Sequence, residues 1–222
     1  FQGLNLEKVA KISEEYVDFM QELKQEYAIA FPQIIGQAAL NLLGKAEDNL
    51  VLNGTAFNEN QTIPVFKKIN HPIALFHFYL AKAMLCYILK KPEMALKNAK
   101  NAEKYKASCS GMYGVALNNF YYSLGLLASF SKAKIKQQKE ILKQVAILQE
   151  TMKIWAFYAP TNFQHKYDLV EAETMRIFGD KWEASELYDR GIQSAKNNGF
   201  LHEEALANEL AAEFYLANNR EK

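Results

Sequence analysis

The sequence predicts an all-α protein in which antiparallel helix pairs stack into a right-handed superhelix. Apolar residues recur at spacings of three and four along most of the 222 residues, whereas the alternating pattern typical of strands is nearly absent. Only 10 Gly and 5 Pro interrupt the chain, so its elements should be long and its turns few. Short links between consecutive helices favour antiparallel neighbours.

The composition is that of a folded globular chain. Half of the residues are hydrophobic, 23% are charged and the formal net charge is +1, which excludes the highly charged, weakly hydrophobic class of disordered proteins. Two cysteines are too few for a disulfide framework, and neither a signal segment nor a run of 18 apolar residues is present. We therefore expect a cytoplasmic protein that makes no membrane contact.

The ends of the sequence suggest an excised piece. Phe1-Gln2-Gly3 matches the end of a common protease-cleavage tag, so residues 1–3 are expected to be an expression remnant. Lys222 follows an apolar-periodic segment that has nothing after it to pack against, which predicts truncation at the C-terminus. Residues 4–222 should form a single helical-repeat domain. Its expected parts are N-terminal helices with an irregular segment, degenerate helix pairs and better-defined repeats, over 4–72, 73–158 and 163–222.

The first helix is expected from Leu4 to Ala30, with Pro32 ending it or starting the next. A short helix should run from Gln33 to Leu43 and end at Gly44, because glycine tolerates the left-handed conformation after a helix. Residues 45–71 are irregular and rich in Asn, and we expect short helical turns within them.

From Ile73 the apolar rhythm is regular. Pro92 suits the first turn of a helix, and Pro160 ends the long helix before it. The pairs Gly179-Asp180 and Asn198-Gly199 separate the last three helices. The expected helices are 73–89, 92–106, 111–130, 134–158, 163–178, 182–196 and 202–217.

One segment, residues 166–195, resembles a tetratricopeptide repeat. The residues that carry the pattern are Ala172, Met175, Gly179, Asp180, Ala184, Tyr188 and Gly191. Small residues let the two helices approach, and the aromatic ring fills the space between successive pairs. The template also fits residues 83–102, although residues 111–158 depart from it. The equivalent turn positions Gly179 and Asn219 are 40 residues apart, so the repeats are enlarged.

Several runs carry a narrower resemblance. They are Trp155-Ala156 and residues 160–167, 169–173, 186–190 and 198–209, with 38–47 and 102–105 nearer the N-terminus. These runs resemble the helical-repeat region of large cyanobacterial-type sensor kinases, in which a serine/threonine kinase, a nucleotide-triphosphatase, a GAF domain and a histidine kinase share one chain. The resemblance implies a piece between the nucleotide-triphosphatase and the GAF domain. The sequence contains neither a phosphate-binding glycine loop nor a kinase catalytic loop, so those activities do not transfer to it.

No residue pattern predicts a catalytic centre, a cofactor or a metal site, and we expect no enzyme activity of this fragment. His165, Asp168 and Glu171 follow one another at steps of three, which could place metal ligands near one helix face. We interpret them instead as a solvated repeat surface, with His165 as a polar residue of the first turn. Glu203, after His202, is interpreted as an acidic residue that the helix N-terminus favours.

Lysines gather in two stretches, 97–106 and 132–143. Such stretches can bind nucleic acid by releasing counterions. The near-neutral net charge and the absence of a basic groove interleaved with aromatic residues argue against this partner. We expect solvated helix faces or a docking surface for an acidic partner domain.

The first helix of each pair lines the concave side of a helical-repeat array. The residues expected there are His77, Met84, Tyr87, Leu169, Glu173, Arg176, Glu209 and Glu213. A groove that mixes apolar and charged groups suits a peptide, a neighbouring domain or a small ligand.

The expected function is that of a non-catalytic, tetratricopeptide-like interaction and signal-relay module of a multidomain bacterial sensor kinase. Its groove would bind a protein segment or another domain of the same chain. The alternative is a receptor for a small effector that regulates the adjacent nucleotide-triphosphatase and kinase domains, since similar regions in related signalling ATPases bind inducers. The truncated C-terminal helix could also pair with a second copy in a homodimer.

Overall fold

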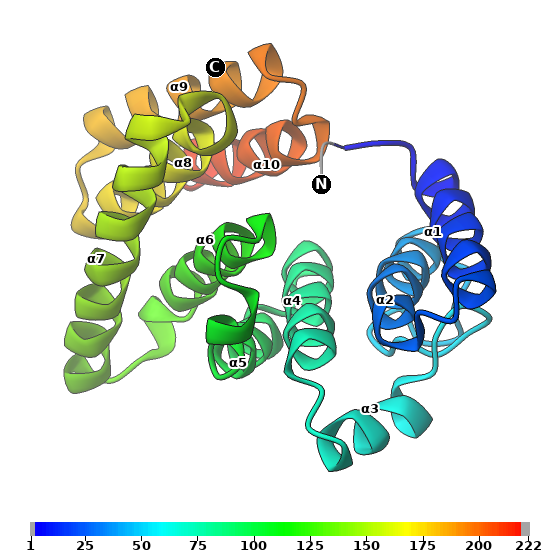
Figure 1. The fold of residues 1–222 in the computed structure, drawn as a ribbon. Helices are drawn as coiled ribbons and strands as arrows, with labels where there is room; N and C mark the ends of the chain where they lie inside the picture. The colour runs from blue at the N-terminus through cyan, green and yellow to red at the C-terminus, as the bar shows by residue number, and fades with distance from the viewer. Residues whose placement is uncertain (1–2, 219–222) are drawn as a thin grey trace. The chain divides into compact units, whose positions relative to one another are not determined.

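A computed structural model describes residues 3–218, and this part of the chain is helical almost throughout (Figure 1). The α-helices are α1 (Leu6–Glu22), α2 (Glu26–Leu42), α3 (Glu59–Lys68), α4 (Pro72–Ile88), α5 (Pro92–Glu103), α6 (Tyr113–Ala128), α7 (Ile135–Tyr158), α8 (Pro160–Phe178), α9 (Lys181–Asn197) and α10 (Leu201–Ala217). The described residues form no strand, only an isolated bridge between Asn53 and Asn58. The all-α prediction is confirmed.

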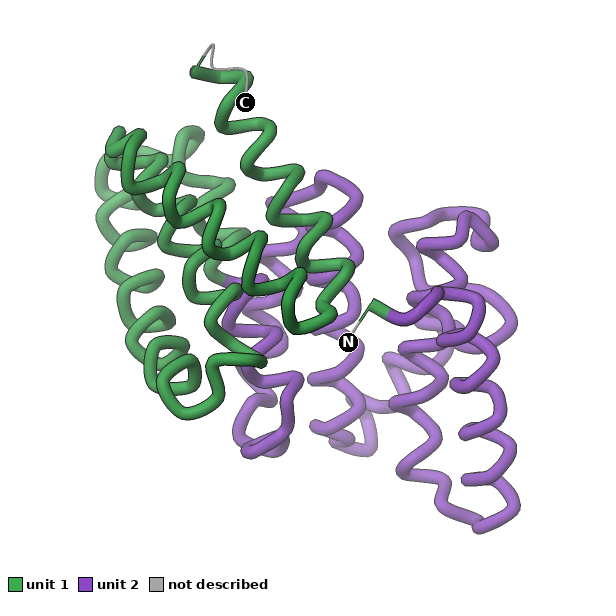
Figure 2. The backbone as a smooth tube through the Cα atoms, turned by 90° about the horizontal axis from the view of Figure 1, so that it is seen from above, with its two compact units in different colours: residues 1–3, 123–222 green, residues 4–122 purple. Residues whose placement is uncertain are grey.

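The chain divides into two compact units, which Figure 2 shows in different colours. Unit 2 is Leu4–Tyr122, and unit 1 comprises Gly3 and the residues from Ser123 onward. One continuous array over 4–222 stays a prediction. Asn219, the expected equivalent of Gly179, lies outside the described residues, as do Phe1, Gln2 and Lys222. Within residues 3–218 no helix has the length and apolar character needed to span a membrane.

The expected helix from Leu4 to Ala30 is wrong, because the chain reverses between α1 and α2. Lys24 has a φ of 55°, in the left-handed region, and its amide donates to the carbonyl of Gln21. The reversal packs α1 against α2 at Gly36, where a Cβ would lie 2.9 Å from that of Ser13. Pro32 is inside α2, at the cost of one backbone hydrogen bond.

Polar side chains of α2 hold the irregular segment that follows it. The Gln37 carbonyl oxygen accepts hydrogen bonds from the amides of Ala56, at 3.2 Å, and Phe57, at 3.3 Å. Asn41 donates to the carbonyl of Val51 at 2.7 Å. Helix α3 lies within this segment, as expected. Gly44, which follows α2, has a φ of 71°, the left-handed conformation expected of a glycine after a helix. Leu52 and Phe57 thereby join the core between α2 and α4.

Small residues allow close contact among α4, α5 and α6. Ala95 and Ala99 on α5 are fully buried. A Cβ on Gly114 of α6 would lie 3.2 Å from side-chain atoms of Phe76 and Leu80 on α4. The predicted reliance on small residues is therefore confirmed at these contacts.

Unit 1, like unit 2, consists of helices that pack closely through small residues. Helices α8 and α9 form an antiparallel pair across Gly179, whose φ of 83° ends α8. Ala172, Ala184 and Gly191 are buried where these helices meet. Helix α7 packs on α8, and α10 on α9. The buried face of α7 consists of Val145, Leu148, Gln149, Met152 and Ala156.

Candidate functional site

Helix α8 bonds to all three of its neighbours through polar side chains. His165 meets Glu203 on α10, Asp168 meets Arg190 on α9, and Glu171 accepts from Gln149 on α7 at 2.8 Å. Each step of three residues turns the helix by about −60°, so the three side chains point toward different helices. Metal ligation by this trio would require convergence, and the described residues contain no group of three His, Cys, Asp or Glu side chains able to hold a metal ion.

The most buried cluster joins α8 to α10. The Lys166 ammonium donates to Glu203 Oε2 at 2.7 Å and to the carbonyl of Asn162 at 2.9 Å. It also lies 4.5 Å from the centre of the Phe200 ring. The His165 Nε2 atom shares the same Glu203 oxygen. Lys166 is 0% exposed and Glu203 1% exposed, so this ion pair is shielded from water.

Burial sets the direction of the pKa shifts of His165 and Lys166, whereas neighbouring charges and hydrogen bonds set that of Glu203. Burial lowers the pKa of His165, an effect strengthened by the Lys166 charge and opposed by Glu203. Burial also lowers the pKa of Lys166, against the pull of Glu203. For Glu203, burial alone would raise the pKa, but the hydrogen bond from His165, the neighbouring His202 ring and the Lys166 charge lower it. Glu203 is thus the carboxylate that favours the charged form of Lys166.

A second cluster links α8 to α9. The buried Glu173 carboxylate accepts a hydrogen bond from Arg176 Nη2 at 2.6 Å and another from the Tyr188 hydroxyl. Burial and the Glu173 charge raise the pKa of Tyr188, so this phenol stays protonated as a donor. Burial alone would lower the pKa of Arg176, but Glu173 raises it. The Arg176 side chain remains 39% exposed. The cluster therefore fixes a cation at the surface of α8.

The interpretation of His165 and Asp168 as residues of a solvated surface is wrong, and Glu203, although it lies in the first turn of α10 as expected, is buried. His165 and Asp168 are 3% and 2% exposed. The apolar spacing in the sequence could have predicted that His165 and Glu203 are buried. Glu203 stands at spacings of three, four and seven from Leu206, Ala207 and Leu210, on the buried face of α10. His165 precedes the buried Leu169 by four residues in the same way.

The predicted groove residues of unit 1 have mixed exposure. Leu169 and Glu173 are buried, and Glu173 pairs with Arg176 as described. Arg176 on α8 and Glu209 and Glu213 on α10 are exposed. Among the predicted groove residues of unit 1, Glu173 and Arg176 are the two that contact each other, as an ion pair.

The predicted groove residues of unit 2 belong mainly to its packing. His77 is 8% exposed, and its Nδ1 lies 2.9 Å from the carbonyl of Ile73. Burial lowers the pKa of His77. Tyr87 packs edge-on against Tyr121 at 5.9 Å between ring centres, and Met84 is half-buried beside the α4 and α6 core.

Comparison with protein-family models, with curated proteins and with solved structures gives no match to this chain. The resemblance to the sensor-kinase repeat region therefore rests on the sequence runs quoted above.

Proposed function

We propose that the chain is a non-catalytic, tetratricopeptide-like module that binds a protein segment and relays signals within a multidomain sensor kinase. The observation that carries the proposal is the cation held by α8. A buried carboxylate, Glu173, fixes the Arg176 guanidinium while leaving part of it exposed. The side chain is ordered before any partner arrives, which lowers the entropy cost of binding. Its planar fork matches the carboxylates of a peptide.

The helical pairing supports this proposal. In tetratricopeptide-type arrays the first helices of successive pairs share one face. Helices α8 and α10 would be such first helices, and Lys166 in the N-terminal half of α8 pairs with Glu203 in the first turn of α10. Arg176 on one and Glu209 and Glu213 on the other are exposed. A segment that carries both signs of charge would suit this surface.

The test is selection of peptides from a phage-displayed random library against the full chain, followed by fluorescence anisotropy. Arg176→Lys keeps the charge but removes the fork, and it should weaken the selected peptides roughly tenfold. Arg190→Lys is the matched control, because Arg190 also bonds to a buried carboxylate, Asp168, but from α9. Equal affinity for both variants, or failure to select any peptide, would refute the proposal.

A second candidate function is the binding of a small polar effector. Two buried ring nitrogens beside the α8–α10 contact, His165 Nδ1 and His202 Nδ1, have no hydrogen-bond partner among the described residues. A ligand that paired with them would recover the free energy lost on burying them unpaired. Thermal-shift measurements with nucleotides, sugars and amino acids should then show stabilisation that grows with concentration. A flat response to every compound would eliminate this candidate.

A further inference from the structure

Helix α7 has one face against α8 and an opposite face that no described helix of unit 1 covers. The covered side chains are those of Val145, Leu148, Met152 and Ala156. The uncovered face consists of exposed residues at spacings of three and four: Lys136, Lys139, Glu140, Lys143, Ile147, Glu150, Ile154, Phe157 and Tyr158. At 1.5 Å per residue this face extends for roughly 33 Å.

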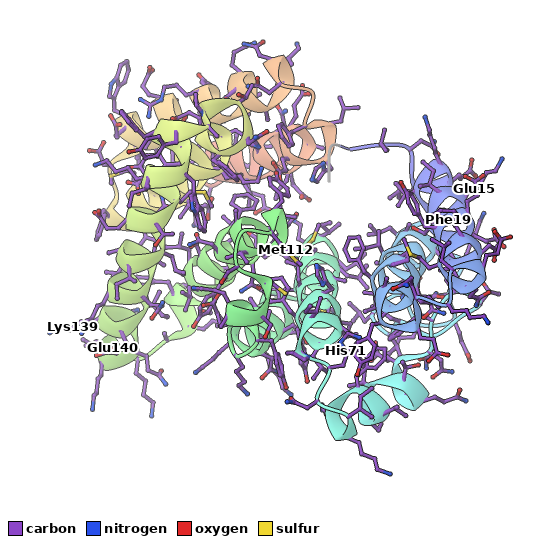
Figure 3. All side chains as sticks on the ribbon, in the orientation of Figure 1. Glu15, Phe19, His71, Met112, Lys139 and Glu140 are labelled. Atoms are coloured by element: carbon purple, nitrogen blue, oxygen red, sulfur yellow. The ribbon has the colours of Figure 1, made fainter. Side chains whose placement is uncertain are left out.

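The N-terminal half of this face is basic. Lys136, Lys139 and Lys143 are exposed, and the described part of the chain gives none of the three an ion-pair partner. Figure 3 shows Lys139 and Glu140 projecting from this end of α7. Lys136 lies in the first turn of α7, where a cation opposes the macrodipole, so its charge does not stabilise the helix. The arrangement of the three lysines is instead suited to an external anion.

The C-terminal half of the same face is apolar. Phe157 and Tyr158 are 79% and 80% exposed, and Ile147 and Ile154 are more than half exposed. These four large apolar side chains lie on one face of α7 within about three turns, with Glu150 between Ile147 and Ile154. Their exposure is unfavourable in water, and a partner that covered them would gain the free energy of burial.

The order of the lysines and the apolar residues along α7 distinguishes between the classes of partner that could bind this face. A helix that lies on a membrane carries its lysines on the side opposite its apolar residues, whereas α7 carries both on one face, one after the other. Glu150 also stands among the apolar residues, where an anionic lipid surface would repel it. Nucleic acid would use the lysines only and leave the apolar half uncovered. An amphipathic helix can match both halves at once.

We infer that the exposed face of α7 docks an amphipathic helix of a partner protein, with acidic residues opposite Lys136, Lys139 and Lys143 and apolar residues opposite Ile147, Ile154, Phe157 and Tyr158. This surface is separate from the Arg176 surface and does not depend on the function proposed for it. Charge complementarity sets the direction of the partner helix, because only one orientation places its acidic end at the lysines.

The experiment uses the full chain and a phage-displayed library of single helices with one randomised face. Selected helices should be acidic toward one end of that face and apolar toward the other. In anisotropy measurements, the triple variant Lys136→Glu, Lys139→Glu, Lys143→Glu should bind them roughly tenfold or more weakly, since several charge pairs become repulsive. Ile154→Ser should weaken them as well.

The matched control is the triple variant Lys97→Glu, Lys100→Glu, Lys104→Glu, which changes the net charge equally at exposed positions of unit 2. It should bind as the unaltered chain does, and so should Arg176→Lys. The inference is overturned if selected helices lack the acidic-to-apolar order, or if both triple variants weaken binding equally. It is also overturned if the lysines bind phosphatidylserine vesicles or a DNA duplex while no helix is selected.

Discussion

At the residue scale, the ammonium of Lys166 has lost its water and depends on Glu203, on the carbonyl of Asn162 and on the face of Phe200. A buried ion pair is a weak source of stability, because desolvation offsets much of the attraction, but removing one partner leaves a buried charge uncompensated. The free energy of unfolding that is lost when Glu203 is replaced therefore measures how well the α8–α10 contact excludes water.

Glu203→Gln should lower the free energy of unfolding by about 3 kcal/mol. This is the low end of the range for breaking a buried pair, since the amide oxygen still accepts a hydrogen bond. Glu204→Gln, one residue further along α10 and partly exposed, should change it by no more than about 0.5 kcal/mol. Urea unfolding followed by circular dichroism measures both. Similar losses in the two variants would mean that Glu203 is not the essential partner of Lys166.

The same cluster should make the fold less stable in mild acid. The pKa of His165 lies below its ordinary value of 6.5, so below that pH the unfolded chain binds a proton that the folded chain does not. Stability then falls as the pH drops from about 7 into the mildly acidic range below 6.5, the ordinary pKa of histidine. Glu203 adds nothing in this range, because a carboxyl at its ordinary pKa of 4.5 is already ionised in the unfolded chain and the lowered pKa keeps it ionised in the folded chain.

Urea midpoints measured across that pH range test the prediction. His165→Gln should flatten the pH dependence of the midpoint, and His77→Gln should flatten it further, because burial lowers the pKa of His77 too. Midpoints that did not change with pH in the original chain would contradict the direction of these pKa shifts.

The residues of this cluster were poorly predicted from the sequence for a physical reason. Charged side chains are almost never fully buried unless paired, so residue type alone favours a surface position for His165 and Glu203. His165 and Glu203 are 38 residues apart in the chain, and the residues around each of them do not indicate that the two side chains pair. The apolar periodicity of α10 was the better guide, since it places Glu203 among buried positions.

At the scale of elements, helix bounds were predictable where the chain carries a residue with a backbone requirement. Pro92, Pro160 and Gly179 each stand within one residue of an observed helix end. Lys90 adopts a φ of 58° at a turn that the following Pro92 made predictable. Lys24 adopts a similar φ with no proline or glycine beside it, and residues 4–30 were expected to be one helix. Tertiary packing, not local preference, decides that turn.

Replacing glycine by alanine should change the stability of the protein in opposite directions at two helix contacts, that of α8 with α9 and that of α4 with α6. On Gly191 of α9 a Cβ would lie 3.5 Å from its nearest neighbour, the carbonyl of His165, which is ordinary contact. Gly191→Ala should therefore stabilise the protein by about 0.5–1 kcal/mol through helix propensity. On Gly114 of α6 the Cβ would lie 3.2 Å from buried Phe76 and Leu80 atoms, and Gly114→Ala should cost about 1 kcal/mol.

Thermal and urea unfolding of the two variants give the sign of each change. Gly191→Leu serves as the size control on α9, because its longer side chain cannot fit against the backbone of α8 and should destabilise the protein. If Gly191→Ala were destabilising, the α8–α9 crossing would be closer than its Cβ distance indicates.

At the scale of the whole molecule, the boundary between the two units falls inside α6, between Tyr122 and Ser123. The sequence predicted the helix but not the division, because apolar periodicity is continuous on both sides of that point. Phe120 and Leu124, which stand on either side of it, are both fully buried. Helices shorter than about 12 residues are marginal in water, so neither portion of α6 is expected to persist without the other. The two units should therefore unfold together.

The tryptophans allow this coupling to be measured, because Trp155 and Trp182, the two in the chain, both lie in unit 1. Ile34→Ala removes a fully buried side chain from the core of unit 2 and should cost about 2–5 kcal/mol. If the units unfold as one, the tryptophan fluorescence midpoint in urea falls together with the circular dichroism midpoint. A Trp182→Phe background restricts the signal to Trp155, which packs against Phe163. A fluorescence midpoint that stayed fixed while circular dichroism showed an earlier transition would show that α6 does not couple the units.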